Sequence, residues 1–89
     1  MVEVTSDLQV PVRVTQMPEK KRCDVYIPDL NMTIHGTTYT NAMAEAVLKM
    51  TAYYYYCKDR NHELTFSNTY ESVADMCDDT DFVTFIGIY

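Results

Sequence analysis

Glycine is scarce in this sequence, since Gly36 and Gly87 are the only two among 89 residues. A phosphate-binding loop needs several closely spaced glycines, so nucleotide binding through such a loop is excluded. No apolar run approaches the about 18 residues that a membrane-spanning helix needs. The first residues also lack the basic and hydrophobic regions of a secretory signal. These absences predict a cytoplasmic protein that makes no membrane contact.

Basic residues are few as well. Seven Lys and Arg stand against 13 Asp and Glu, which gives a formal net charge of -6 and a pI of about 4.6. DNA or RNA would be repelled at long range, whereas a basic partner would be attracted and steered. We therefore expect no direct nucleic-acid binding by this segment. The acidity alone leaves open whether it serves a partner or only solubility.

Metal-ligand patterns are also missing. The three cysteines Cys23, Cys57 and Cys77 are widely spaced without a C-x-x-C pair, and His35 and His62 do not complete a zinc pattern. We expect three reduced thiols that pack as small hydrophobic side chains, as in a cytoplasmic protein. No metal and no cofactor is predicted.

The densest carboxylate cluster lies near the C-terminal end and comprises Asp75, Asp78, Asp79 and Asp81. It lacks the glycine and the terminal glutamate of a calcium loop, so a solvated acidic patch is the preferred interpretation. No two ionisable groups can be seen to converge on one pocket, so we predict that the chain is not an enzyme and has no catalytic residues. The remaining enzymatic alternative is a small nuclease or metal-dependent hydrolase that would depend on His35 or Asp79.

Alternating apolar residues predict the first two strands. The even positions from Leu8 to Val14 are apolar, which indicates a strand with one buried face. Pro11 cannot donate a ladder hydrogen bond, so this strand is expected at an edge or with Pro11 pointing outward. Residues 1–7 are expected to be a tail. A second strand over Cys23–Ile27 ends at Pro28 and pairs with the first as a hairpin.

Two further strands follow from the same alternation. A short third strand over Met32–His35 ends at Gly36, where we expect the backbone to need conformational freedom. The last strand covers Phe82–Tyr89 and is largely apolar on both faces. That composition places it centrally in the sheet or beneath a covering element.

Apolar residues spaced by 3.6 positions predict a long helix over about residues 39–58, capped by Thr38. Asn68 or Thr69 caps a short second helix that ends near Cys77. The element order is then β-β-β-α-α-β, an α+β fold formed by one domain over residues 1–89. Its antiparallel sheet is expected to carry both helices on one face.

Four consecutive tyrosines from Tyr53 to Tyr56 lie on the predicted long helix. Successive helical positions point about 100° apart, so burying one stripe leaves other rings at the surface. Tyrosine is enriched at protein interfaces, although exposed tyrosines without a partner are also common. The predicted partner-binding residues are Tyr53, Tyr55, Tyr56, Asp75, Asp78, Asp79 and Asp81.

One stretch of the chain resembles a known family. The run Tyr26-Ile27-Pro28-Asp29-Leu30, followed by His35-Gly36, Thr38 and a helix with Ala42 and Ala46, is similar to the HicB family of antitoxins. The similarity covers about residues 8–88. Asn31-Met32-Thr33 stands where the family usually has Pro-Gly-Cys. The C-terminal DNA-binding segment of many members is not expected here, either because the sequence is a fragment or because it is a naturally short member. The motif residues, with structural roles, are Tyr26, Pro28, Asp29, Leu30, Gly36, Thr38, Ala42 and Ala46.

The resemblance implies both a fold and a function. The fold would be HicB-like, a degraded form of the ribonuclease-H-like or double-stranded-RNA-binding-like folds without catalytic residues. The function would be that of a bacterial antitoxin in a type II toxin–antitoxin system, which binds and inhibits a small basic HicA-type mRNA interferase. The alternative is an orphan oligomerisation or ligand-sensing module, because the last strand could pair across a two-fold axis. For either function we expect a homo-oligomer, a dimer.

Overall fold

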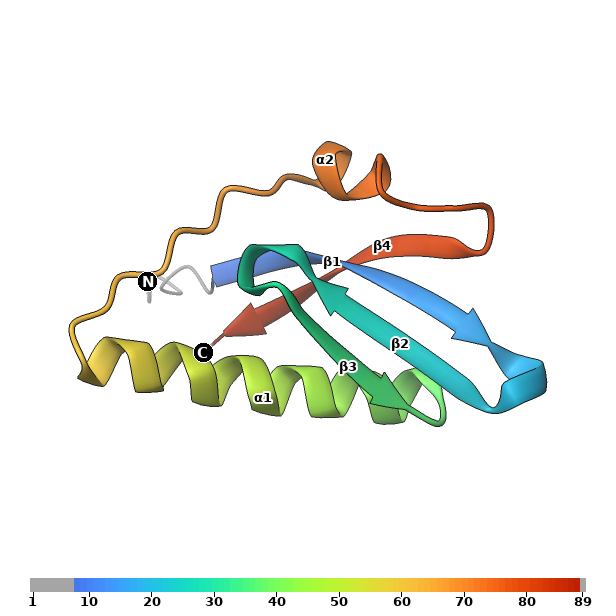
Figure 1. The fold of residues 1–89 in the computed structure, drawn as a ribbon, viewed down its shortest axis with the longest axis horizontal. Helices are drawn as coiled ribbons and strands as arrows, with labels where there is room; N and C mark the ends of the chain where they lie inside the picture. The colour runs from blue at the N-terminus through green and yellow to red at the C-terminus, as the bar shows by residue number, and fades with distance from the viewer. Residues whose placement is uncertain (1–7, 89) are drawn as a thin grey trace, which may run out of the picture.

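The structure is a computed structural model that describes residues 8–88, without the side chains of residues 8 and 88. The predicted tail over residues 1–7 and Tyr89 of the predicted last strand lie outside the described residues. The elements are β1 (Leu8–Met17), η1 (Pro18–Lys20), β2 (Arg22–Ile27), η2 (Pro28–Leu30), β3 (Met32–Gly36), α1 (Tyr39–Asp59), α2 (Tyr70–Ala74) and β4 (Asp81–Ile88), where η marks a short 3-10 helix (Figure 1). The predicted order of strands and helices is confirmed.

The four strands form one antiparallel sheet in the order β3-β2-β1-β4. β1 is therefore central, and the predicted edge position of this strand is wrong. Pro11 lies opposite Phe85 of β4, whereas pairing between β1 and β2 begins only at Arg13. Its missing N–H therefore leaves the β1–β2 ladder intact. β4 is an edge strand within the described residues, so the first of its two predicted alternatives, a central position, is wrong; the second, a covering element, agrees with the contacts that α1 and α2 make with it.

α1 covers one face of the sheet and buries its apolar stripe there. The core cluster joins Val10, Val12 and Val14 of β1 to Ala42, Ala46 and Met50 of α1. Cys23 and Cys57 are buried, as predicted, whereas Cys77 is only half-buried. Burial raises the pKa of the Cys23 thiol, with a smaller contribution from the charge of Asp24. The protonated thiol packs as a small apolar group.

Gly36 ends β3 for a reason that differs from the prediction. No described glycine has a positive φ, so backbone freedom is not needed there. A Cβ at position 36 would instead lie 2.7 Å from both the Cα and the N of Ala42. Glycine at 36 is therefore what lets the first turn of α1 approach β3.

α2 lies on the face of the sheet opposite α1, so the prediction that both helices share one face is wrong. Side chains alternate along β1, and Arg13 points away from the core valines. Its Nη1 donates to the carbonyl of Met76 just after α2, at 3.3 Å. On the same face, the Tyr70 ring of α2 stacks on Phe85 with centroids 6.4 Å apart. Figure 1 shows the two helices on either side of the strands.

Local capping explains where the helices begin. The Thr38 hydroxyl accepts a hydrogen bond from the Asn41 N–H at 3.1 Å, which confirms the predicted cap of α1. Thr69 and Ser72 form a reciprocal capping box at α2. α2 ends at Ala74, earlier than the predicted end near Cys77.

Candidate partner-binding surfaces

The tyrosine cluster divides between core and surface, as predicted for four successive helical positions. Tyr53, Tyr55 and Tyr56 are exposed by 38%, 42% and 53%. Tyr54 packs against the core, and its ring lies 6.5 Å from that of Phe66. The C-terminal half of α1 therefore presents three rings for contact.

Cations accompany two of these rings. The Lys58 Nζ lies 5.9 Å from the Tyr55 ring centroid, and the Arg60 Cζ lies 4.5 Å from that of Tyr56. A hydrogen bond to Cys57 raises the pKa of the Tyr53 hydroxyl. Two of the three exposed rings thus have a cation beside them, while the exposed Asp59 lies between Lys58 and Arg60 in the sequence.

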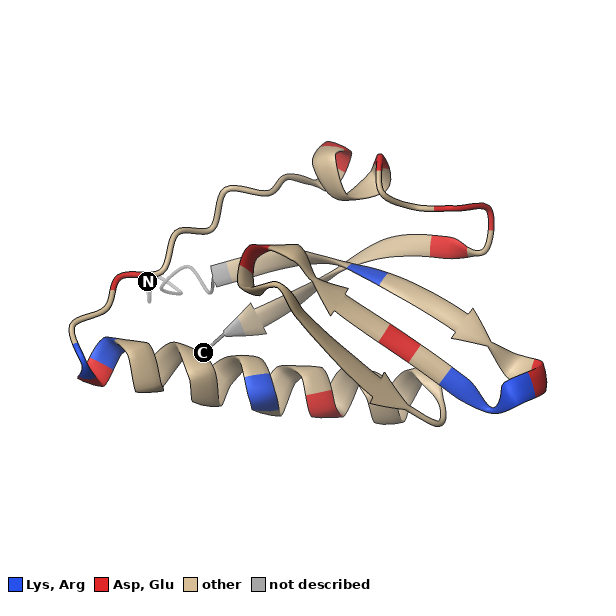
Figure 2. Cartoon of the chain, in the orientation of Figure 1, with Lys and Arg blue, Asp and Glu red and all other residues tan. Residues whose placement is uncertain are grey.

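The predicted acidic residues lie elsewhere, around α2 and the start of β4 (Figure 2). Asp75, Asp78 and Asp79 are exposed, whereas Asp81 is half-buried. Asp81 accepts hydrogen bonds from the Thr15 hydroxyl at 2.7 Å and from the Asp78 N–H at 3.0 Å. Asp81 therefore orders the turn into β4, while the other three carboxylates face solvent.

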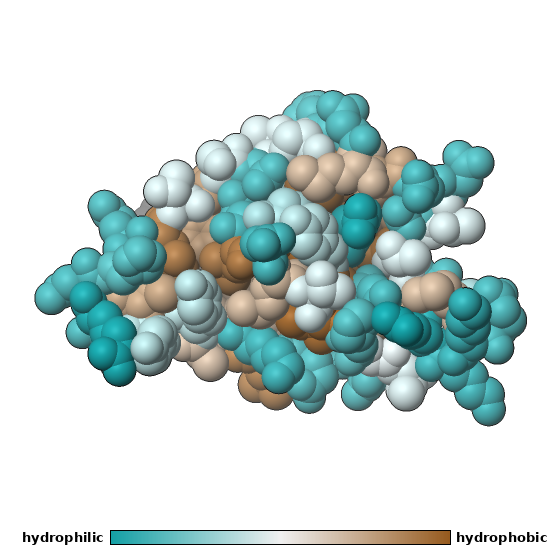
Figure 3. Space-filling view, viewed as in Figure 1, coloured by the Kyte–Doolittle hydropathy of each residue, from teal (hydrophilic) through white to brown (hydrophobic). Residues whose placement is uncertain are grey.

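The structure does not bring the two predicted contact groups together. The tyrosines follow the second half of α1, and the carboxylates follow α2 at the other end of the molecule (Figures 1 and 2). Hydrophilic side chains cover most of the face drawn in Figure 3, and hydrophobic ones show only in separate small areas. Within residues 8–88, no three His, Cys, Asp or Glu side chains are placed to hold a metal ion.

Two of the residues that carry the sequence resemblance, Asp29 and Tyr26, make contacts within the fold. The Asp29 Oδ1 accepts hydrogen bonds from the Ser67 N–H at 2.8 Å, the Asn68 N–H at 3.1 Å and the Asn68 Nδ2 at 3.0 Å. These bonds fix the segment between α1 and α2 against η2. Tyr26 lies beneath the Arg13 guanidinium, whose Cζ is 5.1 Å from the ring centroid.

A polar groove on the sheet face that α1 leaves open was not foreseen from the sequence. Its volume is about 310 Å³, and its lining residues are Arg13, Thr15, Asp24, Tyr26, Thr33, Asp78, Thr80 and Asp81. Three of them are aspartates against one arginine, Arg13, so the groove has an excess of negative charge that suits a cationic group. The polar positions that alternate with Cys23, Val25 and Ile27 were the available signal.

Asp24, one of the three aspartates that line this groove, is held by two neighbouring side chains. Its Oδ1 accepts a hydrogen bond from the Arg22 Nε at 3.0 Å and lies 2.7 Å from the His35 Nδ1. Burial opposes ionisation of Asp24, but the hydrogen bonds and charges of Arg22 and His35 outweigh it and lower its pKa. Asp24 therefore carries a negative charge at neutral pH.

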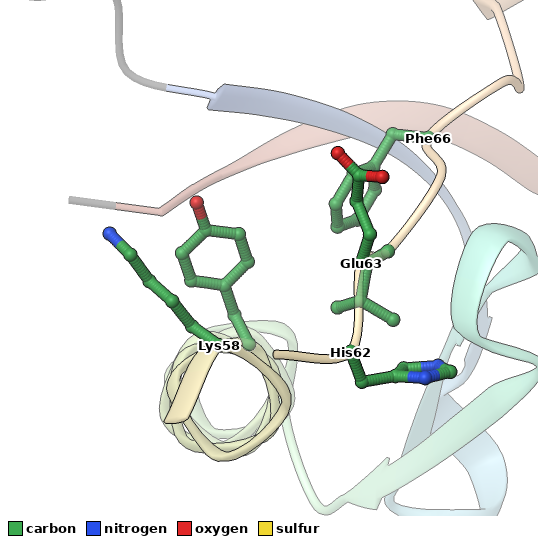
Figure 4. A pocket seen from close by; sticks show the side chains of 6 residues that line it. Lys58, His62, Glu63 and Phe66 are labelled. Atoms are coloured by element: carbon green, nitrogen blue, oxygen red, sulfur yellow. The ribbon is translucent and has the colours of Figure 1, made fainter. Parts of the chain in front are cut away.

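A second pocket of about 330 Å³ lies where α1 ends, lined by Tyr54, Lys58, His62, Glu63, Leu64 and Phe66. Figure 4 shows Lys58 and Glu63 on opposite sides of it, with the His62 ring turned away from the Glu63 carboxylate. The alternation of Leu64 and Phe66 in the segment after α1 was the only sequence signal for it. Its charged groups do not converge on one point, so the pocket offers no pair of groups placed for acid–base catalysis.

Comparisons with known proteins do not identify a relative. No family model matches the chain, and neither a curated protein nor a solved structure matches it. None of the helices in residues 8–88 is both long and apolar enough to span a membrane. The groove, the acidic segment and the tyrosines therefore have to be interpreted from their own chemistry.

Proposed function

We propose that this chain is a non-catalytic, antitoxin-like domain that binds a small basic ribonuclease and inhibits it by covering its RNA-binding surface. Such inhibition requires surface complementarity and no bond chemistry. An acidic scaffold associates quickly with a cationic enzyme and competes with RNA for the same positive surface. The HicB-like fold and the HicA-type identity of the toxin belong to the same proposal, on the basis of the motif residues from Tyr26 to Ala46.

The observation that carries the proposal is the acidic groove on the open face of the sheet. Asp24, Asp78 and Asp81 line it, and the exposed carboxylates of Asp75 and Asp79 lie in the adjoining segment. A Lys or Arg side chain of the partner could enter the groove and replace its own phosphate contacts with carboxylate contacts. The groove is therefore the favoured contact site, and the tyrosine surface is the second.

The direct test is a titration of RNA cleavage. A fixed amount of a cognate HicA-type ribonuclease is mixed with increasing amounts of this protein, and cleavage of a labelled RNA is followed. We expect cleavage to stop near equimolar protein, and the protein alone to leave the RNA intact. Undiminished cleavage at molar excess would contradict the proposal.

A matched pair of variants locates the contact. Asp78→Asn with Asp79→Asn removes two exposed charges beside the groove, whereas Glu19→Gln with Glu63→Gln removes two exposed charges elsewhere. Both pairs change the net charge equally. Weaker inhibition by the first pair alone would support the groove, and equal weakening by both would indicate non-specific attraction.

A further inference from the structure

β4 leaves one of its sides unpaired. It pairs with β1 from Asp81 to Ile88, and no strand within residues 8–88 lies on its other side. Eight residues of strand extend about 27 Å at about 3.4 Å per residue. Such an edge presents backbone N–H and C=O groups that can pair with another strand.

β4 also lacks the usual protection of an edge. Natural edge strands are kept apart by short length, lysines, prolines or bulges, but β4 has no Lys and no Pro, and Asp81 at its first position is its only charge. β3, the opposite edge, has only five residues, and its His35 Nδ1 lies 2.7 Å from the Asp24 Oδ1. The two edges therefore differ, and β4 is the one open to pairing.

Exposed aromatic rings flank this edge on both faces of the sheet. On the α2 face, Phe85 is 45% exposed and stacks on Tyr70, which is 52% exposed. On the α1 face, Phe82 is 39% exposed and lies 5.8 Å from the ring of Tyr39. A strand added beside β4 would cover these rings as well as the backbone.

We propose that β4 pairs antiparallel with β4 of a second copy of this chain, joining two four-stranded sheets across a two-fold axis. Such pairing requires the axis to be perpendicular to the sheet. Each residue of β4 then lies opposite a residue of the other copy whose side chain is on the same face of the sheet. One central residue, Thr84 or Phe85, then faces its own counterpart. The two Asp81 carboxylates lie about 20 Å or more apart, beyond the screening length of about 8 Å at physiological salt.

The choice of a second copy rests on this self-complementarity. Pairing of β4 with β3 of another copy would leave edges open and extend without closing, and the short length of β3 disfavours it. The four rings, at about 150–250 Å² each and exposed by 37–52%, offer roughly 350 Å² per copy. That is below the about 800 Å² per partner of a standard interface, so we expect a weak dimer that depends on concentration.

Sedimentation velocity of the protein alone, from about 10 µM to about 1 mM, tests the inference. We expect a monomer–dimer equilibrium that shifts toward dimer as salt screens the repulsion between two chains of net charge -6. Phe85→Lys should weaken association about tenfold or more, because it places a charge on the edge. Leu48→Lys, at an exposed site on α1, should change it by less than about twofold. Circular dichroism checks that both variants fold.

Cysteine cross-linking locates the axis, in a Cys77→Ser background that leaves only buried thiols. Thr84→Cys or Phe85→Cys should form a disulfide with its own copy on oxidation, while Leu48→Cys should not. A chain that stays monomeric at about 1 mM, or cross-links at neither position, would overturn the inference. Open-ended oligomers would equally contradict it. The inference would also be overturned if the protein is a monomer and the only effect of Phe85→Lys is a loss of toxin inhibition. That result would mean that the toxin binds the β4 edge.

Discussion

The contact between Gly36 and Ala42 determines how closely α1 approaches the sheet. A methyl group at position 36 would lie 2.7 Å from backbone atoms of Ala42, so α1 or β3 must move to relieve the overlap. We expect Gly36→Ala to lower the free energy of unfolding by about 1–3 kcal/mol, as measured by urea denaturation. Thr37→Ala, at the exposed next position, is the control and should change it by less than about 0.5 kcal/mol. Equal effects of the two would contradict the close approach.

Asp24 gives the fold a dependence on acidic pH. Burial opposes its charge, but the hydrogen bonds and charges of Arg22 and His35 prevail and hold its pKa below the usual value. A carboxyl with a lowered folded-state pKa stabilises the fold above its unfolded pKa of about 3.9, and that stabilisation is lost as pH falls through the folded value. We therefore expect Asp24→Asn to be less stable than the natural protein at neutral pH, and the difference to shrink toward pH 2.

Urea denaturation at several pH values between about 7 and about 2 measures this effect. The matched control is Asp79→Asn, since Asp79 is exposed and has no hydrogen-bond or ion-pair partner in the described part of the chain. Its stability curve should run parallel to that of the natural protein. A constant difference between Asp24→Asn and the natural protein at every pH would show that Asp24 acts through packing and not through its charge.

Elements whose signals are local were predicted well. α1 is predicted over about 39–58 and spans Tyr39–Asp59. The prediction succeeds because the Thr38 cap and the apolar stripe both lie in the sequence of the helix or directly before it. The placement of α2 and β4 depends on contacts between distant residues. Asp29 holds residues 67 and 68 by hydrogen bonds across 38 and 39 positions, which directs the chain to the face away from α1. No local pattern carries that information.

The same reasoning applies to the candidate site. Exposure of three of the four tyrosines followed from helical geometry alone, so it could be predicted. The acidic groove combines Arg13, Asp24 and Asp78, which come from β1, β2 and the segment between α2 and β4 and meet only after the sheet has formed. The alternation along β2 is enough to place Asp24 on the face away from the core, but it does not show which side chains surround Asp24.

The exposed tyrosines of α1 lead to a prediction about what this helix contributes to toxin binding. Tyr53 and Tyr56 are 38% and 53% exposed, so replacing both with Ala removes contact area with little loss of packing. If the helix contacts the toxin, Tyr53→Ala with Tyr56→Ala should weaken inhibition of RNA cleavage about tenfold or more, as for aromatic interface residues. Leu48→Ala, 65% exposed on the same helix, is the control. Unchanged inhibition would leave the acidic groove as the contact site.

At the scale of the whole molecule, the net charge of -6 affects two associations in opposite directions. Attraction of a basic ribonuclease is weakened when salt screens unlike charges, whereas pairing of two acidic copies is strengthened when salt screens like charges. Raising salt from about 50 mM to about 500 mM should therefore raise the protein concentration needed for half inhibition of cleavage and lower the dimer dissociation constant.

Each response has its own readout, cleavage of RNA for the first and sedimentation of the protein alone for the second. Neutralising Asp78 and Asp79 with Asn should flatten the salt dependence of inhibition, because both carboxylates lie in the acidic segment by the groove. The same double substitution should alter the salt dependence of dimer formation less, since neither residue belongs to β4. Inhibition that grows stronger with salt would mean that apolar contacts, centred on the tyrosines, dominate over charge in holding the toxin.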